Sequence, residues 1–350
     1  MTYDTIVIGA GQAGLASAFY LKERGVNFLV LNAGPEPTGS WPSYYESLKL
    51  FSPAAYCSLP GKAFPGDADH YPVRDEVVAY LKNYAAAFEF PIQNNASVED
   101  IRKDGDVYHV ETAEGESFAT RTVLAASGSF STPYIPHLPG ADQYAGSIIH
   151  AYEYVKPKDF EGQRVVVVGS GNSAVQIAVE LAECATVSIA SKRKIQFFPQ
   201  TLLGKDMHFW LKLTGLDHLQ ILRDQSTPVM DTGEYKRAVK SGKPDRRKMF
   251  TEFTATGIRW ADGSEEAIDT VLFATGYRAN LPYLALLGLD DGLETKAIKN
   301  GVSATNPDIF FMGFSGLRSF SSATLRGVGR DADYVVGRIA KRIDHDEKKE

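Results

Sequence analysis

Two short stretches of this chain have the residue types and the spacing of a dinucleotide-binding turn, G-x-G-x-x-[GA]. They are Gly9–Gly14 (GAGQAG) and Gly169–Ala174 (GSGNSA). In such a turn the first glycine permits a tight bend, the second lets the backbone approach a pyrophosphate, and the third small residue lets a helix pack on a strand. The helix that follows presents unpaired N–H groups and the positive end of its dipole to the phosphates. The spacing therefore predicts two sites for phosphate-bearing cofactors.

The segments around both turns have the strand–turn–helix order that such sites need. Short β-branched runs precede them, typical of strands buried on both faces of a parallel sheet, and apolar residues at helical spacing follow. A second strand comes after each helix. The predicted strands are residues 5–8 and 28–31 for the first turn, and residues 165–168 and 186–189 for the second. A third match, Gly327–Ala332, follows no such strand, so we predict no binding turn there.

One turn holds one dinucleotide, so two turns predict two cofactors held face to face, and the pair expected is FAD with a nicotinamide nucleotide. The fold class that follows is α/β, with two Rossmann-like dinucleotide-binding domains, an NADPH domain being inserted in an FAD domain. We expect the FAD domain to comprise residues 1–157 and 271–350, and the NADPH domain residues 158–270. A length of 350 residues is sufficient for two domains with cores of their own.

The ends of the two second strands predict which nucleotide each turn prefers. An acidic residue there usually accepts a hydrogen bond from the ribose 2′-hydroxyl, and the first site has Asn32 and Ala33 instead. The second site continues as Ser191-Lys192-Arg193-Lys194, without an acid. Lys192 and Arg193 could pair with a 2′-phosphate, which favours NADPH over NADH. The alternative is that these cations form only a solvated basic tip.

Composition excludes several classes of protein. The net charge is −6 and no block of Lys and Arg is longer than the 192–194 tip, so nucleic-acid binding is not expected. No apolar run approaches the length of a membrane span, and the first strand begins too close to Met1 for a leader peptide, so we expect a cytoplasmic enzyme. No metal ion is expected. The sequence leaves the oligomeric state open, with a homodimer as the commonest assembly.

The two cysteines exclude one kind of electron transfer. Cys57 and Cys184 are far apart in the sequence, and neither belongs to a C-x-x-C motif. Reductases of the thioredoxin-reductase and glutathione-reductase classes need a redox-active cysteine pair to pass electrons to a disulfide. We therefore expect two free, buried thiols and a different electron acceptor.

The order of the remaining segments supports an inserted domain. A meander of short strands is predicted from residue 99 to residue 124, and it ends in small residues, Ala126–Gly128. A similar apolar strand ending in Ala274–Gly276 follows the second site, as expected where a chain crosses between domains close to a cofactor. Residues 308–313 are predicted to return to the first domain, and residues 323–342 to form a helix before a charged tail.

The whole chain resembles the flavin-containing monooxygenases, in particular their small bacterial two-domain members. The identifying motif of that family, F-x-G-x-x-x-H-x-x-x-[YF], is matched by residues 144–154 (YAGSIIHAYEY), with tyrosine in place of the leading phenylalanine. Residues 39–41, 50–53 and 58–61 also resemble segments of relatives. Residues 228–233 are similar to a segment of the plant auxin-forming flavin monooxygenases.

The two turns and this resemblance together give a set of expected cofactor-binding residues. Around the first turn and the segments that cross near it they are Gly9, Gly11, Gln12, Ala13, Gly14, Asn32, Ala33, Gly39, Ser40, Trp41, Phe51, Ser52, Val98, Ser127, Gly128, Ser322, Ala323 and Thr324. Around the second turn they are Gly169, Gly171, Asn172, Ser173, Ala174, Ser191, Lys192, Arg193, Ala274, Thr275 and Gly276. No catalytic residue is predicted.

The resemblance implies the reaction. NADPH reduces FAD by hydride transfer, the reduced flavin forms a C4a-(hydro)peroxyflavin with dioxygen, and one oxygen atom passes to a small substrate, a sulfide or an amine. Baeyer–Villiger relatives end the motif in Trp where this chain has Tyr154, which argues against that subclass. Many relatives carry an Asn near Phe51 and Ser52, and none stands here. His150 is expected to hold the linker between the domains rather than to act as an acid or base.

The segment Phe197–Leu222 is the candidate substrate wall, because Met207–Leu211 are bulky and precede a turn at Gly215. It is interpreted either as a lid that includes Trp210 or as the core of the inserted domain. His208 is expected to be a structural histidine. Two other functions stay open: an FAD/NADPH reductase of a quinone or disulfide that uses no cysteines of its own, and a flavin-bound redox sensor.

Overall fold

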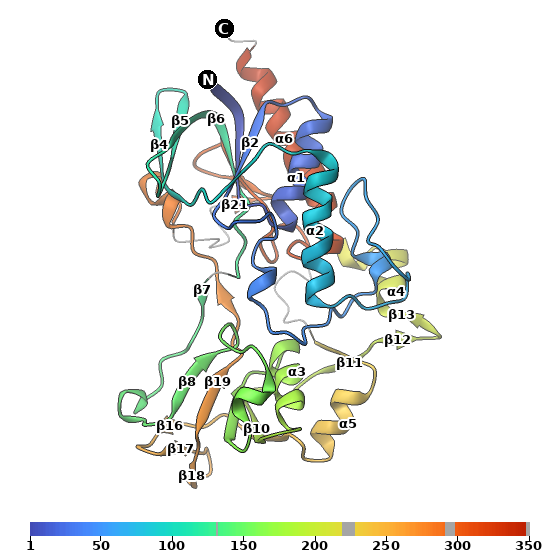
Figure 1. Ribbon diagram of the computed structural model, residues 1–350, viewed down its shortest axis with the longest axis vertical. Coiled ribbons are helices and arrows are strands. Elements are labelled where there is room, and N and C mark those ends of the chain that lie inside the picture. The colour runs from blue at the N-terminus through green and yellow to red at the C-terminus, as the bar shows by residue number, and fades with distance from the viewer. Residues whose placement is uncertain (131, 219–227, 291–297, 348–350) are drawn as a thin grey trace.

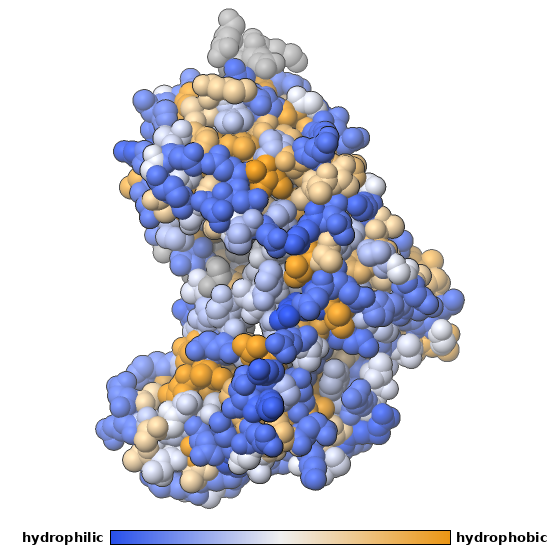
Figure 2. Space-filling view, in the orientation of Figure 1, coloured by the Kyte–Doolittle hydropathy of each residue, from blue (hydrophilic) through white to orange (hydrophobic). Residues whose placement is uncertain are grey.

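The chain folds into two lobes, each built on its own sheet (Figure 1). This computed structural model describes residues 1–130, 132–218, 228–290 and 298–347. Two extended segments join the lobes, and they pair as the short antiparallel strands β7 (Thr132–Pro133) and β20 (Tyr277–Arg278). In the space-filling view the outline is indented on the left at this junction (Figure 2).

The upper lobe contains a nine-stranded sheet whose central strands are parallel and run in the order β23-β6-β1-β2-β3. The bounds of its strands are β1 (Thr2–Ile8), β2 (Phe28–Asn32), β3 (Ile92–Asn94), β4 (Val98–Asp104), β5 (Val107–Thr112), β6 (Ser117–Ala125), β21 (Ile298–Lys299), β22 (Val302–Ser303) and β23 (Ile309–Phe311). The helices α1 (Gln12–Glu23), α2 (Arg74–Phe88) and α6 (Leu325–Glu347) lie together on one face (Figure 1). The predicted meander is confirmed as β4, β5 and β6.

Alternation along the central strands explains the two apolar layers of this lobe. Val7, Val30 and Leu124 pack against α1, α2 and α6. Their neighbours Ile6 and Ile8 pack on the opposite face, with residues of β4, β5 and the 3₁₀ helix Pro282–Leu287. Both faces of β1 are therefore covered, as its continuous β-branched run predicted.

The lower lobe contains a five-stranded parallel sheet with the order β15-β10-β9-β19-β8. Its elements are β8 (Ser147–His150), β9 (Arg164–Val168), α3 (Asn172–Leu181), β10 (Thr186–Ser191), α5 (Glu234–Lys240), β15 (Asp245–Lys248) and β19 (Thr270–Phe273). Helices α3 and α5 pack on one face. The small antiparallel sheet of β16 (Glu252–Phe253), β17 (Gly257–Arg259) and β18 (Glu265–Ala267) covers the other.

The strands of the lower sheet extend beyond the predicted NADPH domain, residues 158–270. Strand β8 lies before residue 158 and most of β19 lies after residue 270, yet both pair within this sheet. Hydrogen-bonded strands share one core, so the boundaries 157/158 and 270/271 cut through it. The second glycine turn marks only the middle of this sheet, so its position does not locate the outer strand β8.

A third group of elements leaves the lower sheet after β10 and reaches the upper lobe. We call residues 195–218 the excursion segment. It contains β11 (Phe197–Pro199), β12 (Thr201–Leu202), β13 (Lys205–Asp206), α4 (Met207–Thr214) and a 3₁₀ turn at Leu216–His218. The chain returns through β14 (Val229–Asp231), which pairs with β11. Residues 219–222 of the predicted substrate wall lie outside the described residues.

Two smaller predictions are also settled by the described residues. The third glycine match, Gly327–Ala332, lies inside helix α6 and forms no strand-to-helix turn. The expected charged tail from Asp344 is helical as far as Glu347. Among the described residues, no helix combines the length and the apolar character needed to cross a membrane.

Candidate functional site

The first glycine turn is closed so tightly that side chains are excluded. Gly9 has φ +102°, and a Cβ atom on it would lie 2.8 Å from the carbonyl oxygen of Ala126. A Cβ atom on Gly14 would lie only 1.9 Å from the carbonyl oxygen of Gly9. The backbone of α1 therefore touches the turn that precedes it, which is the close helix–strand packing that the third glycine permits.

The helices after both turns begin without side-chain caps. Gly11 and Gly171 are the N-cap residues of α1 and α3, both are extended, and neither provides a side-chain hydrogen bond. The first turn of each helix contains no acidic residue. The free N–H groups and the positive dipole end are thus available to an anion. This donor set fits the pyrophosphate of a dinucleotide at either turn.

Gln12 connects the first turn to two distant segments. Its Oε1 accepts a hydrogen bond from Trp41 Nε1 at 3.0 Å, and its Nε2 donates to the carbonyl oxygen of Ala323 at 2.7 Å. A Cβ atom on Gly39 would lie 2.8 Å from Gly11 Cα, so the loop that carries Trp41 crosses directly over the turn. Three groups of predicted residues, near residues 11, 40 and 323, are therefore brought together.

Asn32 ends β2 beside the first turn, and it is buried. Its Nδ2 donates to the carbonyl oxygens of Gly34 and Glu36 and to Asn94 Oδ1, at 2.8–3.0 Å. The donors of this amide are thus used to shape the loop after β2. Its Oδ1 is the atom that could accept from a ribose hydroxyl.

The segments that cross between the lobes lie against the two turns in the same way. A Cβ on Gly9 would also approach Ser127 Cα to 3.0 Å, and a Cβ on Gly169 would lie 2.6 Å from the carbonyl oxygen of Ala274. Ser127 shares a hydrogen bond of 2.8 Å with Tyr283, while Thr275 donates to the carbonyl oxygen of Tyr134. The two strand ends that look alike in the sequence, Ser127 and Ala274, thus occupy the same position relative to their glycine turns.

His150 joins the two crossing segments. Its Nδ1 accepts from the Tyr152 N–H at 3.1 Å, so its Nε2 carries the proton and donates to the carbonyl oxygen of Gly276 at 3.0 Å. Burial lowers the pKa of His150, which favours this neutral form. Both ring nitrogens are used, and the role predicted for His150 in the linker is confirmed.

The second turn is more open than the first. A Cβ atom on Gly171 would meet no atom within 4 Å. Asn172 faces the end of the chain's return path, because its Oδ1 accepts from the Met230 N–H at 3.1 Å and its Nδ2 donates to the carbonyl oxygen of Pro228 at 3.3 Å. Ala174 is buried, whereas Ser173 is exposed.

The basic tip after β10 contains a residue that the sequence did not suggest. Lys192 and Arg193 are exposed, as predicted for groups that meet a phosphate. Arg246, on the neighbouring strand β15, donates from Nε to Ser191 Oγ at 3.1 Å and from an η nitrogen to the carbonyl oxygen of Arg193 at 3.0 Å. No signal in the sequence placed Arg246 there, because strand pairing brings it across 53 residues.

The remaining predicted residues occupy several places around the upper lobe. Ser322 is fully buried and its Oγ accepts from the N–H groups of Arg318 and Ser319, which fixes the loop before α6. Ser52 contacts Cys57, with 3.2 Å between Oγ and Sγ. Val98 packs in the core on the sheet face opposite α1. The described contacts give Val98 no link to the glycine turn.

The excursion segment docks on the upper lobe through a buried ion pair. Arg326 Nε and Nη2 each lie 2.9 Å from a carboxylate oxygen of Asp217, and both side chains are less than 10% exposed. Ser321 Oγ donates to the carbonyl oxygen of Asp217. Because Arg326 follows Ala323, the contact partner of Gln12, the segment meets the upper lobe close to the first turn. Sequence reasoning missed this pair, since neither residue belongs to a motif.

A second polar contact fixes the other end of the excursion segment. Gln200 Nε2 donates to the carbonyl oxygen of Phe51 at 3.0 Å, and His208 packs against the Phe51 ring, with 6.1 Å between the ring centroids. Met207 and His208 are buried but belong to neither core of the lower lobe. Of the two interpretations of this segment, the core of the inserted domain applies to Phe197, which packs on the core around α3, and not to Met207 and His208.

The upper lobe also inserts a loop into the lower one. Tyr45 is 3% exposed and packs in the core around α3, where its hydroxyl donates to Gln176 Oε1 at 2.6 Å. Ser47 and Tyr154 both donate to Glu180 Oε2 at 2.8 Å. The two glycine-turn lobes are thus held together by polar contacts to one face of α3.

Both cysteines are free, as predicted. Cys57 is fully buried, and burial raises the pKa of its thiol to about 11. Cys184 is half-buried rather than buried, since it lies at the end of α3. The described residues contain no cysteine pair that could exchange electrons with a disulfide.

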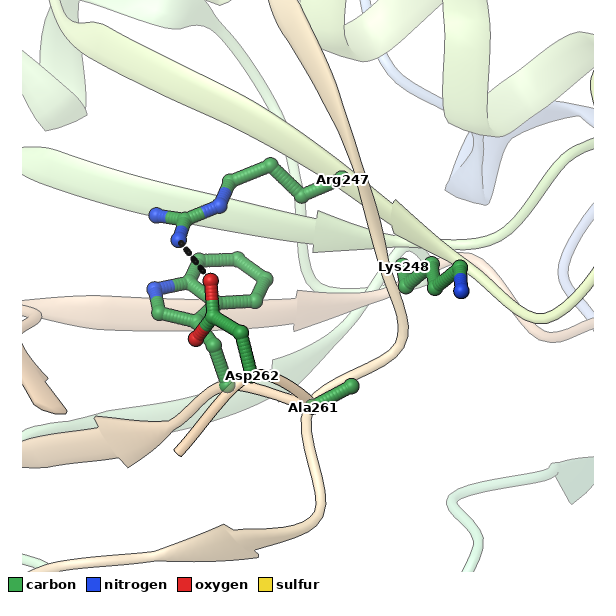
Figure 3. A pocket seen from close by; sticks show the side chains of 5 residues that line it. Arg247, Lys248, Ala261 and Asp262 are labelled. Carbon is green, nitrogen blue, oxygen red and sulfur yellow. Dashed lines mark ion pairs between the residues drawn. The ribbon is translucent and has the colours of Figure 1, made fainter. Parts of the chain in front are cut away.

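A cavity of about 270 Å³ opens on the lower lobe beside Arg247 and Trp260 (Figure 3). The Arg247 guanidinium lies 3.9 Å from the centre of the indole ring and forms ion pairs with Asp262 and Glu266. Arg247 pairs in register with Ala190, which faces the core opposite α3. The charge of Arg247 is therefore compensated, and the cavity lies on the face of the sheet opposite α3.

A protein-family model described as pyridine nucleotide-disulphide oxidoreductase matches residues 6–313. The chain is 33% identical over 345 residues to an uncharacterized oxidoreductase, CzcO-like, of Geobacillus kaustophilus, with 96% of this chain and 98% of that protein covered. It is 28% identical to the probable indole-3-pyruvate monooxygenase YUCCA1 of Arabidopsis thaliana, over 97% of this chain and 90% of that protein.

Among solved structures, the chain is similar to a flavin-containing monooxygenase from Stenotrophomonas maltophilia. The TM-score is 0.86 with 28% sequence identity, and 97% of this chain and 99% of that chain are covered. The two lobes and their connections are thus shared with a protein of nearly the same length.

Proposed function

Because this chain belongs to the pyridine nucleotide-disulphide oxidoreductase family and is similar over nearly its whole length to flavin monooxygenases, we propose that it is an FAD- and NADPH-dependent monooxygenase. Its substrate is a small soft nucleophile, a sulfide or an amine. The observation that carries the proposal is the pair of uncapped helix N-termini behind two glycine turns, one in each lobe.

FAD binds at the first turn. The N-terminus of α1 would hold its pyrophosphate, and Asn32 Oδ1 would accept from the adenosine ribose. Gln12 and its hydrogen-bond partners, Trp41 and the loop before α6, would line the rest of this site. When bound, FAD supplies the ring system that accepts hydride from NADPH and that activates dioxygen. The overall reaction for a sulfide is R₂S + O₂ + NADPH + H⁺ → R₂SO + NADP⁺ + H₂O.

NADPH binds at the second turn, with its pyrophosphate at the N-terminus of α3. Lys192 and Arg193 pair with the 2′-phosphate, and Arg246 holds the backbone of that tip in position. The unit that binds NADPH begins at or before β8 and extends through β19, because these strands complete its sheet.

The chain's own residues exclude water and hold the two lobes together. The Asp217–Arg326 pair keeps the excursion segment against the upper lobe, and Tyr45 anchors the upper lobe in the core around α3. Exclusion of water is essential to such an enzyme, because hydration of the reactive site diverts reduced oxygen to hydrogen peroxide.

The proposal is tested with labelled dioxygen. The purified protein, loaded with FAD, is supplied with NADPH, thioanisole and ¹⁸O₂, and the sulfoxide is examined by mass spectrometry. We expect one ¹⁸O atom per sulfoxide and one NADPH consumed per product. A protein that never binds flavin refutes the proposal, and NADPH oxidation with unlabelled product or with quinone as the only acceptor indicates the reductase instead. Tight nucleotide binding without turnover indicates the redox sensor.

A further inference from the structure

Asp206 accepts hydrogen bonds from three residues, Tyr71 of the upper lobe and Gln200 and His208 of the excursion segment. Its Oδ2 accepts from the Tyr71 hydroxyl at 2.5 Å and from Gln200 Nε2 at 2.7 Å. Its Oδ1 accepts from the backbone N–H and from Nδ1 of His208, both at 2.7 Å. Burial raises the pKa of Asp206, but these hydrogen bonds outweigh burial and the net pKa is lowered. The group is therefore a carboxylate that accepts and does not donate.

This carboxylate decides the tautomer of His208. An ionised carboxylate has only acceptors, so Nδ1 of the neutral imidazole must carry the proton and Nε2 must hold the lone pair. Within the described parts of the chain, Nε2 has no hydrogen-bond partner. The described side-chain atoms that are sealed from solvent without a partner are Ser129 Oγ, Arg318 Nε and Asp331 Oδ2. His208 Nε2 is not among them, and the His208 side chain is 2% exposed.

His208 belongs to the excursion segment and faces the upper lobe. Its ring stacks near Phe51, one of the expected flavin-contacting residues, and lies 5.8 Å from Tyr56. The ionisable groups around the pair come from the excursion segment and from the loop 49–71; they are Lys49, Tyr56, Asp69, Tyr71, Lys205 and Lys212. The lysines lie over the rings of Tyr71, Phe209 and Tyr56, whereas Asp206 is the group in direct contact with the imidazole.

We propose that Asp206 and His208 form an oriented base that deprotonates amine substrates before they are oxygenated. This inference rests on the proposed monooxygenase function and assigns residues to one step of it. Asp206 is the positioning residue, and His208 Nε2 is the acceptor. The geometry is that of a carboxylate holding an imidazole by Nδ1, which leaves Nε2 directed away from its partner.

The chemistry explains why an amine needs this base and a sulfide does not. An aliphatic amine arrives at neutral pH as R₃NH⁺, which has no lone pair to attack oxygen. Its N–H bond breaks, the bonding electrons return to nitrogen, and the proton forms a new bond to His208 Nε2. The resulting imidazolium is stabilised by Asp206 and releases the proton to solvent. A sulfide carries its lone pairs at every pH.

The test compares three substrates of similar size, with the FAD-loaded enzyme at pH 7. Benzyldimethylamine is protonated at this pH, whereas N,N-dimethylaniline and thioanisole are neutral. His208→Asn keeps an amide donor for Asp206 but removes the base, and we expect kcat/KM for benzyldimethylamine to fall about 100-fold. Asp206→Asn keeps the helix cap of α4 and removes the charge, for which we expect a fall of about 10-fold. We expect these falls to appear in the ratio of kcat/KM for benzyldimethylamine to kcat/KM for each neutral substrate, because a merely structural loss lowers all three together.

Three controls make the outcome decisive. His70→Asn changes an exposed histidine paired with Glu76 and should leave all three substrates unaffected. Raising the pH above the amine pKa should remove most of the His208→Asn deficit. Nitrogen-15 NMR of labelled histidine should show the Nδ1–H tautomer in the wild type and its loss in Asp206→Asn, without turnover.

The results separate this inference from the proposed function. Equal losses for charged and neutral substrates, an unaltered tautomer in Asp206→Asn, or a wild type that oxygenates thioanisole but not benzyldimethylamine would each overturn the base while leaving the monooxygenase standing. Failure to oxygenate any of the three would overturn both.

Discussion

Around the first glycine turn, three other segments of the chain close in: the end of β6, the loop at Gly39 and the start of α6. The second turn is contacted by the end of β19 and by the return path at residues 228–230, and Gly171 meets nothing within 4 Å. The two turns have the same spacing and the same uncapped helix. They differ in how much of the remaining chain encloses them.

This difference in enclosure bears on how easily a nucleotide can leave each turn. A cofactor enclosed by three segments cannot leave without moving them, whereas one bound at an open turn can dissociate on each cycle. On the proposed function, FAD would stay at the first turn, and NADPH would be replaced at the second after each hydride transfer.

The largest effect is expected from Gly14→Ala, which tests whether the first turn is as closed as its geometry indicates. The new Cβ would lie 1.9 Å from the carbonyl oxygen of Gly9, so α1 must move away from β1. We expect a protein that retains no FAD, measured by its visible absorbance after purification. The second turn supplies the matched control, because Ala174 already occupies the equivalent position. A yellow Gly14→Ala protein would show that the first turn is not closed.

The next largest effect is expected from Asp217→Asn, which opens the enclosure of the first turn. Removing one partner of a buried ion pair costs about 3–5 kcal/mol, because the other charge stays buried. The free energy of unfolding in urea measures this loss. Asp333→Asn breaks the exposed pair with Arg24, and we expect less than about 1 kcal/mol there. Equal effects would contradict the difference in burial.

Arg193→Ala tests whether the second turn selects NADPH over NADH. Loss of an ionic hydrogen bond to the 2′-phosphate costs about 1.5–3 kcal/mol, or roughly 10- to 100-fold in the ratio of kcat/KM for NADPH and NADH. Flavin content should not change. Lys158→Ala removes another exposed cation of the lower lobe and should leave the ratio as it is. An unchanged ratio in Arg193→Ala would leave only a solvated basic tip.

His150 tests the junction between the two lobes through pH. Because burial lowers the pKa of His150 in the folded state, its contribution to stability is complete above pH 6.5, the pKa of an unperturbed histidine, and is lost as the pH falls through the lowered value. We expect the Tm of wild type to fall more steeply below pH 6.5 than that of His150→Gln, whose amide can still donate to Gly276. Parallel curves would refute this role.

The smallest effect is expected from Gly171→Ala. Its φ of −91° is ordinary for alanine, and the added Cβ meets no atom. We therefore expect the Tm and the flavin content of wild type, with a change confined to the KM for NADPH. A large loss of stability would show that the second turn is as crowded as the first.

Much of this molecule could be predicted from local patterns. The strands that flank both turns, the helices after them, the meander and the rejection of the match at Gly327 were all predicted, because each depends on the spacing of neighbouring residues. The extent of the lower lobe was not. β8 joins its sheet by pairing with β19, more than 100 residues further along the chain, and no local pattern reports such a partner.

The sequence by itself determined where the chain makes its two glycine turns, because a glycine that excludes Cβ and a helix that begins without a cap are properties of a few adjacent residues. Only the tertiary structure decided what surrounds those bends. Asp206 meets Tyr71 across 135 residues and Asp217 meets Arg326 across 109, and neither pair has a motif. Hydrogen bonds and ion pairs between buried groups form wherever packing brings a donor to an acceptor, so the partners are known only once the lobes have closed.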